Sequence, residues 1–284
     1  MRVGLLFDVH VTRGQRRDYD GDERARRGCA VLNDLGVDWT LVGGDLRSLA
    51  SKTTDRVDWG GWHGDGDDQY YRRDFERAKR LFDAELDAPY RVVRGNHDRP
   101  LEAFREVFTP EEHPRYWATR EGGVRHVFLD SSPSHGYHAL YQTQNFVTAP
   151  QLSLLDRLFD RDATVPTFVY CHVPLTTFPT LESDWYQGRT GAYRYTLNHP
   201  AVQRRLARGE TVLVNSGHYS QDRGRAARTV DGVTHVIARH FGKSDPSYDG
   251  DLRWLDIDPD AGVASVHYHD MRDGAEGEIA RITW

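Results

Sequence analysis

The feature that most constrains the fold is a recurrence of short β-prone runs separated by amphipathic segments. Six runs rich in branched and aromatic residues occur at 2–7, 39–43, 90–94, 124–129, 166–171 and 211–215. Between the second and third runs, DQYYRRDFERAKRLFDAEL (68–86) places apolar side chains at helical spacing, with charges on the opposite face. This alternation is typical of layered proteins, so we expect an α/β fold.

Two further helices and a change of pattern are predicted towards the C-terminus. Residues 150–159 open with a proline suited to a first helical turn and continue with leucines at helical spacing, and 198–207 also favours a helix. In 228–238 an Asp-Gly pair divides two β-prone runs, and 252–269 has the same character. We therefore expect antiparallel strands at the end of the chain. No internal repeat divides the sequence, and we predict a single domain over residues 1–284.

Composition indicates a globular protein. Charged residues make up 28%, and the apolar share of 38% is spread over many short runs, unlike that of a disordered chain. The formal net charge of −6 provides no basic field for a nucleic-acid backbone. The N-terminal apolar run is interrupted by Asp8 and is too short for a secretory signal or a membrane span, so we expect a cytoplasmic protein. Cys29 and Cys171 are predicted to be buried thiols.

Polar residues of types that bind metals stand shortly after the ends of five of the six β-prone runs. They are Asp8 and His10, Asp45, the triplet Asn96, His97 and Asp98, then His172, and finally His218. Because sites in open α/β sheets form at the carboxyl ends of strands, these distant segments can converge on one crevice. On an extended strand end, Asp8 and His10 would both point at one ion. Each residue also has a structural interpretation, since Asp45 could form a turn and an isolated histidine is commonly packed or hydrogen-bonded.

These motifs resemble those of the calcineurin-like metallophosphoesterase family. They read DVH (8–10), GGD (43–45), GNHD (95–98), the His of CHVP (171–174) and GHYS (217–220), in the order of the family. The resemblance implies a four-layer α-β-β-α sandwich and a phosphoester hydrolase in which a dinuclear metal centre activates a hydroxide. The order of GNHD, VFLDSS, a Gln-containing helix and CHVPL is similar to the cyclic-nucleotide phosphodiesterase branch. That similarity implies small phosphodiesters or nucleotides as substrates.

The resemblance also implies individual roles. The first metal would be bound by Asp8 and His10, both metals by the bridging Asp45, and the second metal by Asn96, His172 and His218. Carboxylate, imidazole and amide donors together suit Mn, Fe or Zn. His97 would stay off the metals, face the scissile phosphate and protonate the departing alkoxide. Asp98 is expected to have a structural role.

The last motif departs from the family pattern, which usually reads Gly-His-x-His and uses its second histidine for the first metal. Ser220 stands at that position, and a neutral hydroxyl is a poorer ligand for a divalent transition metal than imidazole. If the backbone stays extended, Ser220 and His218 face the same way. The first site should bind metal weakly unless Asp222, Gln221, a water held by Ser220 or His240 fills the position. The alternative to an active hydrolase is a catalytically silent module that binds metal and nucleotides.

Two long connections offer substrate contacts. Residues 184–195 interleave aromatic side chains with Arg189 and Arg194, a mixture that could stack a base and clamp a phosphate. Packing of the aromatic rings on the sandwich explains the composition equally well. Residues 46–66 are open to the same two interpretations. The expected partner is a small phosphorylated substrate rather than a membrane or a nucleic acid, and the sequence predicts no oligomeric state.

Overall fold

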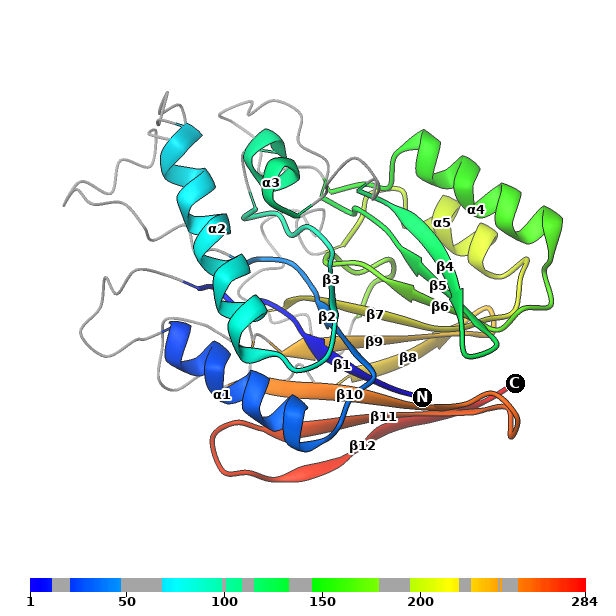
Figure 1. Cartoon of the computed structure of the whole chain (residues 1–284). Coiled ribbons are helices and arrows are strands. Elements are labelled where there is room, and N and C mark those ends of the chain that lie inside the picture. The colour runs from blue at the N-terminus through cyan, green and yellow to red at the C-terminus, as the bar shows by residue number, and fades with distance from the viewer. Residues whose placement is uncertain are drawn as a thin grey trace.

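The computed structural model describes residues 1–11, 21–46, 68–98, 101–108, 115–132, 145–178, 195–219, 226–239, 241 and 250–284. Within these residues the chain forms two six-stranded sheets with helices on their outer faces (Figure 1). The arrangement confirms the predicted α/β class and the four-layer α-β-β-α sandwich.

The first sheet has the strand order β12-β11-β10-β1-β2-β3. Its strands, in that order, are Glu276–Thr283, Val263–Asp270, Asp251–Asp258, Arg2–Leu6, Trp39–Val42 and Tyr90–Val92. The second sheet has the order β4-β5-β6-β7-β9-β8. Its strands are Trp117–Glu121, Val124–Phe128, Thr167–Tyr170, Thr211–Tyr219, Val233–Arg239 and Ala226–Val230. All six predicted runs are strands, whereas β4 and β12 are not among the predicted elements.

Parallel pairing brings the ends of the central strands to common edges. Strands β1, β2 and β3 are parallel to one another, as are β5, β6, β7 and β9. The carboxyl ends within each group therefore lie at one edge of their sheet, where the polar segments begin.

The C-terminal strands complete both sheets. Strand β10 pairs antiparallel with β1, and β8 and β9 form an antiparallel hairpin. The hairpin turns at Asp231 and Gly232, whose φ angles of 49° and 81° are typical of a type I′ turn. Strands β10 and β11 are also antiparallel, so both predicted hairpins are confirmed. The assignment of residues 1–284 to one domain stays a prediction.

The helices cover the outer faces of the sheets. They are α1 (Gly21–Asp34), α2 (Asp68–Glu85) and α3 (Leu101–Phe108) on the first sheet, and α4 (Ala149–Arg161) and α5 (His199–Leu206) on the second (Figure 1). The helix predicted over 68–86 is α2, and those predicted over 150–159 and 198–207 are α4 and α5. In the described part of the chain, no helix has the length and apolar character needed to cross a membrane.

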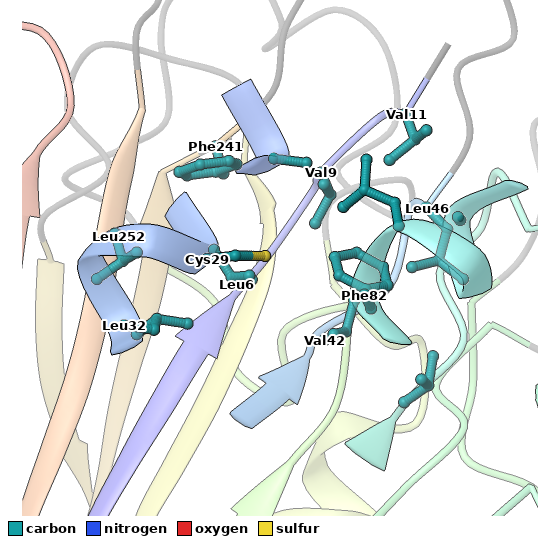
Figure 2. Close-up of a cluster of buried hydrophobic side chains, with 14 of the residues drawn as sticks. Leu6, Val9, Val11, Cys29, Leu32, Val42, Leu46, Phe82, Phe241 and Leu252 are labelled. Atoms are coloured by element: carbon teal, nitrogen blue, oxygen red, sulfur yellow. The ribbon is translucent and has the colours of Figure 1, made fainter. Parts of the chain in front are cut away.

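Among the described residues, the three largest apolar clusters correspond to the three interfaces between the four layers. One joins α1, α2 and α3 to the first sheet and contains Leu6, Cys29 and Phe82 (Figure 2). A second lies between the sheets and includes Leu5, from β1, facing the opposite way to Leu6. The third joins α4 and α5 to the second sheet. Cys29 and Cys171 are buried free thiols, as predicted.

The buried ring of His126 makes the fold sensitive to acid. It stacks on Tyr170 in the middle cluster, and its Nδ1 lies 2.9 Å from the Tyr170 hydroxyl. Burial, reinforced by the charge of Arg91, lowers the pKa of His126 to about 3, so the ring is neutral in the folded state. In the unfolded chain, the imidazole of His126 binds a proton below about pH 6.5. Stability is therefore lost as the pH falls through this value, by about 1.4 kcal/mol for one such histidine at pH 5.5.

Replacing His126 with phenylalanine should remove this contribution. Urea denaturation at pH 7.5 and 5.5 measures the free energy of unfolding at each pH. Between the two pH values, the wild type should lose about 1.4 kcal/mol more than His126→Phe. The comparison cancels the other titrating groups, which both proteins share. An equal loss in both proteins would show that His126 does not stay neutral in the folded state.

Candidate metal centre

The predicted ligands converge where the carboxyl ends of the strands of both sheets meet. Asp8 and His10 follow β1, Asp45 follows β2, and Asn96 follows β3; His172 follows β6, and His218 lies near the end of β7. All six are buried, with exposed fractions of 9% or less. Five strands from two sheets thus supply one cluster, as the sequence pattern predicted.

Asp45 lies at the centre of the cluster. Potential ligand atoms of His10, Asp45 and His97 lie within 4.8 Å of one another, and so do those of Asp45, His172 and His218. The Asp45 Oδ2 lies 3.3 Å from His172 Nε2 and 3.8 Å from His97 Nε2, while Oδ1 accepts a hydrogen bond from the His97 amide at 2.8 Å. The Asp45 carboxylate therefore belongs to both groups of potential ligand atoms.

His172 connects the cluster across the two sheets. Its Nδ1 lies 2.9 Å from the Gly43 carbonyl oxygen, which can only accept, so Nδ1 carries the proton. Its Nε2 lies 3.1 Å from Asn96 Oδ1 and 3.9 Å from Asp8 Oδ1. The backbone contact thus directs Nε2 towards the predicted ligands, as the outer hydrogen bond of a metal-binding histidine commonly does.

The backbone at Asp8, His10, Asp45 and His218 is not extended. Their φ angles are 56°, 49°, 52° and 70°, in the left-handed region that side chains other than glycine rarely occupy. Such conformations cost of order 1–3 kcal/mol each and concentrate at functional sites. The extended geometry expected at the end of β1 is therefore wrong, because the strand ends at Leu6.

Backbone pairing holds the segment after β1 in place. The amides of Asp8, His10 and Val11 donate to the carbonyl oxygens of Gly44, Asp45 and Leu46 at 3.0, 2.9 and 2.7 Å. Val9, Val11 and Leu46 pack in the cluster beneath the helices (Figure 2). The first two candidate ligands, Asp8 and His10, are thus fixed by long-range hydrogen bonds and by their apolar neighbours.

The geometry expected around His218 is also corrected. Strand β7 does not end at residue 215 but continues to Tyr219, and its register against β9 shifts between Ser216 and Tyr219. The positive φ of His218 occurs inside this irregularity, and its amide donates to Asp8 Oδ2 at 2.9 Å. An extended backbone, the condition under which Ser220 would face the same way as His218, is therefore not met.

One glycine of the GGD motif and one of the GNHD motif allow close approach of the segments that carry the candidate ligands. At Gly44, where φ is 89°, a Cβ atom would lie 2.8 Å from His172 Nδ1. At Gly95 it would lie 2.2 Å from both the amide nitrogen and Oδ1 of Asp45. A side chain at Gly44 would displace His172, and one at Gly95 would displace Asp45, so glycine is required at both positions.

Asp98 has the structural role expected of it. Its Oδ2 accepts the Gly95 amide and its Oδ1 accepts the Leu46 amide, each at 2.8 Å. The carboxylate therefore ties the GNHD segment to the GGD segment.

The family assignment rests on a match over most of the chain. A family model described as calcineurin-like phosphoesterase matches residues 1–221. The chain belongs to the calcineurin-like phosphoesterase family. This membership supports a metal-dependent phosphoester hydrolase, the class that the motifs predicted.

Solved structures share the fold of this calcineurin-like phosphoesterase. A dimetal phosphatase from Danio rerio has a TM-score of 0.64 at 14% identity, with 99% of this chain and 98% of that chain covered. The purple acid phosphatase PPD1 from yellow lupin (Lupinus luteus) seeds has a TM-score of 0.62 at 13% identity, with 98% of this chain and 52% of that chain covered. At these identities the likeness shows the fold. No protein with curated annotation matches the chain.

The electrostatics of the cluster fit a bound cation. Burial raises the pKa of Asp8 to about 7, an effect that His172 opposes and the charge of Asp45 reinforces. Burial would lower the pKa of His172, but Asp45 and Asp8 raise it to about 10. Burial alone would raise the pKa of Asp45, yet His172, His97 and His10 lower it well below its usual range. Buried carboxylates that need positive neighbours to ionise are suited to a divalent cation.

Several predicted residues lie outside the described part of the chain. They are Ser220, Gln221, Asp222 and His240, which were considered for the first metal, and Arg189 and Arg194, which were considered for substrate. Their roles stay predictions.

One segment beside the cluster received no role from the sequence. Asp130, Ser131 and Ser132 follow β5, and all three are buried. The available signal was the same as for the candidate ligands, since Asp130 directly follows the fourth β-prone run, residues 124–129.

Proposed function

We propose that this calcineurin-like phosphoesterase hydrolyses small phosphodiesters or nucleotides at a dinuclear metal centre. The observation that carries the proposal is that Asp45 belongs to two ligand groups at once, one with His10 and His97 and one with His172 and His218. A carboxylate placed between two such groups is suited to bridging two ions.

The donor set supports hard or borderline divalent metals. Carboxylate oxygens come from Asp8 and Asp45, an amide from Asn96, and imidazole nitrogens from the histidines. Burial raises the pKa of the Cys171 thiol, and its Sγ donates to the Val173 carbonyl oxygen, so it is poorly suited to act as a ligand. Mn, Fe or Zn fits this set. When bound, the ions would polarise phosphoryl oxygens and lower the pKa of a water.

The protein's own residues orient the groups that would act on the substrate. His97 is the most accessible of the site residues, with a side chain 20% exposed, so it can meet a substrate. Its amide is anchored to Asp45, and its ring contacts that of His10 edge-on at a centroid distance of 5.4 Å. From this position His97 would donate a proton to the departing alkoxide. His172, directed by Gly43, holds Nε2 towards Asp45 and Asn96.

The preference for diesters rests on the resemblance of the motif order to the cyclic-nucleotide phosphodiesterase branch. The serine at position 220 favours the second candidate, a catalytically silent module that binds metal and nucleotides, because it replaces a usual ligand of the first metal. Turnover separates the two candidates.

Metal removal followed by a two-substrate comparison tests the proposed function. After treatment with EDTA the protein should hydrolyse neither bis-p-nitrophenyl phosphate nor p-nitrophenyl phosphate, and added Mn²⁺ should restore activity. The diester should then have the higher kcat/KM, as measured by release of p-nitrophenolate. A higher kcat/KM for the monoester would reject the diester preference. Absence of turnover with Mn²⁺, Fe²⁺ and Zn²⁺, together with retained nucleotide binding, would establish the silent module instead.

A further inference from the structure

Asp130 forms a buried ion pair with Arg94, the residue directly before the GNHD segment. Arg94 Nε and Nη2 lie 3.2 and 3.1 Å from Asp130 Oδ2 and Oδ1, and both side chains are 1% exposed. Arg115 adds a contact of 3.2 Å to Oδ2. Arg94 lies two residues before Asn96. The bidentate pair therefore fixes the chain at the entry to a predicted ligand of the second metal.

Ser131, the residue after Asp130, contacts the segment that carries His172. The Val173 amide donates to Ser131 Oγ at 2.7 Å, and Ser131 is fully buried. Val173 directly follows His172. Two adjacent residues after β5 thus hold the segments of Asn96 and His172, which come from different sheets.

Gln151 of helix α4 holds the segment 130–132 in place. Gln151 is fully buried and bonds both backbone groups of residue 130: Oε1 accepts the amide at 2.8 Å, and Nε2 donates to the carbonyl oxygen at 2.9 Å. The Asp130 carboxylate also accepts the Ser132 amide at 3.0 Å. Residues 130–132 therefore form a rigid connection between the segment that carries Asn96 and the segment that carries His172.

Stability alone is a poor reason for burying this pair. Removing two charges from water commonly costs as much as their attraction returns, and apolar replacements of buried ion pairs are often neutral or stabilising. The geometry points to a different role: we propose that Asp130, with Ser131, is a positioning residue for the second metal site. It sets the separation of Asn96 and His172. The proposal rests on the proposed dinuclear function.

The same contacts predict selectivity between the two metal sites. Asn96 and His172 are held through residues 130 and 131, whereas Asp8 and His10 are held by the backbone of Gly44 and Asp45. A change at residue 130 or 131 should therefore weaken the second metal and spare the first. Loss of an outer contact of this kind typically costs 10–100-fold in metal affinity.

The test compares Mn²⁺ binding by the wild type, Asp130→Asn and Ser131→Ala. Calorimetric titration yields the dissociation constants, and Asn96→Ala identifies which constant belongs to the second site. Asp130→Asn should raise that constant about 10–100-fold, and Ser131→Ala about tenfold, with the other constant unchanged. At two equivalents of Mn²⁺, the electron paramagnetic resonance signal of a spin-coupled pair should be replaced in Asp130→Asn by that of isolated ions. Ser131→Ala removes only one hydroxyl group. If Asp130→Asn does not fold, the second-site dissociation constant of Ser131→Ala tests the positioning role.

Gln203→Leu is the matched control for general destabilisation. Gln203 of α5 makes the same kind of buried clamp, with Nε2 2.7 Å from the Val230 carbonyl oxygen and Oε1 2.9 Å from His235 Nε2. It holds the β8–β9 hairpin at the end of the second sheet opposite the cluster. This variant should lower the melting temperature while binding both ions as the wild type does.

The outcomes separate the proposal from the function on which it rests. If the wild type binds two ions and both test variants bind them equally well, the positioning role is refuted and the dinuclear function stands. The role is also refuted if Gln203→Leu weakens the second ion as much as Asp130→Asn does. A wild type that binds fewer than two ions refutes the dinuclear function, and the positioning role with it.

Discussion

Replacing Asp45 with asparagine should lower kcat/KM for a phosphodiester at least about 100-fold and reduce the bound metal below that of the wild type. The substitution keeps the shape of the side chain but removes the charge shared by both ligand groups. It also takes the main negative partner from His172 and His97, whose Nε2 atoms lie 3.3 and 3.8 Å from Oδ2. Steady-state kinetics and metal analysis of the purified protein measure the two effects.

Asp256→Asn provides the control for this prediction. Asp256 pairs with Arg2 at 2.7 Å and stands opposite Arg2 in the β1–β10 pairing, at the end of β1 away from the cluster. This variant should retain wild-type activity and metal content. If Asp45→Asn kept both ions and full activity, Asp45 would not be a bridging ligand, and the dinuclear assignment would fail.

Replacing His97 with alanine should lower kcat about 10²–10⁴-fold while leaving the bound metal unchanged. The structure makes this a discriminating test, because His97 lies close enough to His10 and Asp45 to form a ligand group with them. A general acid and a metal ligand are therefore both geometrically possible. Loss of turnover without loss of metal identifies the acid, whereas a parallel loss of both identifies a ligand.

Changing the leaving group of the substrate tests whether His97 acts as a proton donor. An alkoxide leaves poorly without a proton, whereas p-nitrophenolate needs little assistance. The effect of His97→Ala should therefore be much larger for a diester with an alkyl leaving group than for bis-p-nitrophenyl phosphate. His269→Ala is the control, since His269 contacts Glu276 at 2.9 Å between β11 and β12. Equal losses for the two substrates would contradict proton donation by His97.

Much of the fold was predictable because its signals are local. The strand runs at 2–7 and 39–43 and the helix at 68–86 follow from residue type and spacing, and the Asp-Gly turn of β8–β9 follows from backbone preference. Strands β4 and β12 were missed. Each of them lies at the edge of its sheet, where mixed burial leaves no continuous apolar run.

The convergence of Asp8, Asp45, His172 and His218 on one cluster was also predictable, whereas their backbone conformation was not. The sequence indicates that Asp8, His10 and His218 stand near strand ends. A two-residue spacing, however, predicts the direction of two side chains only when the backbone conformation is known. Positive φ angles at these residues are held by hydrogen bonds to Gly44, Asp45 and Asp8, partners that lie up to 210 positions away. Local preference opposes such conformations, so only the assembled sandwich can impose them.

The sequence by itself determined which chemical groups stand at the ends of the central strands, because residue type and period specify where those strands run. The tertiary structure alone decided how those groups meet. It placed Asp45 between two sets of histidines and joined Arg94 to Asp130 across the layers, since contacts between segments distant along the chain depend on how the two sheets pack.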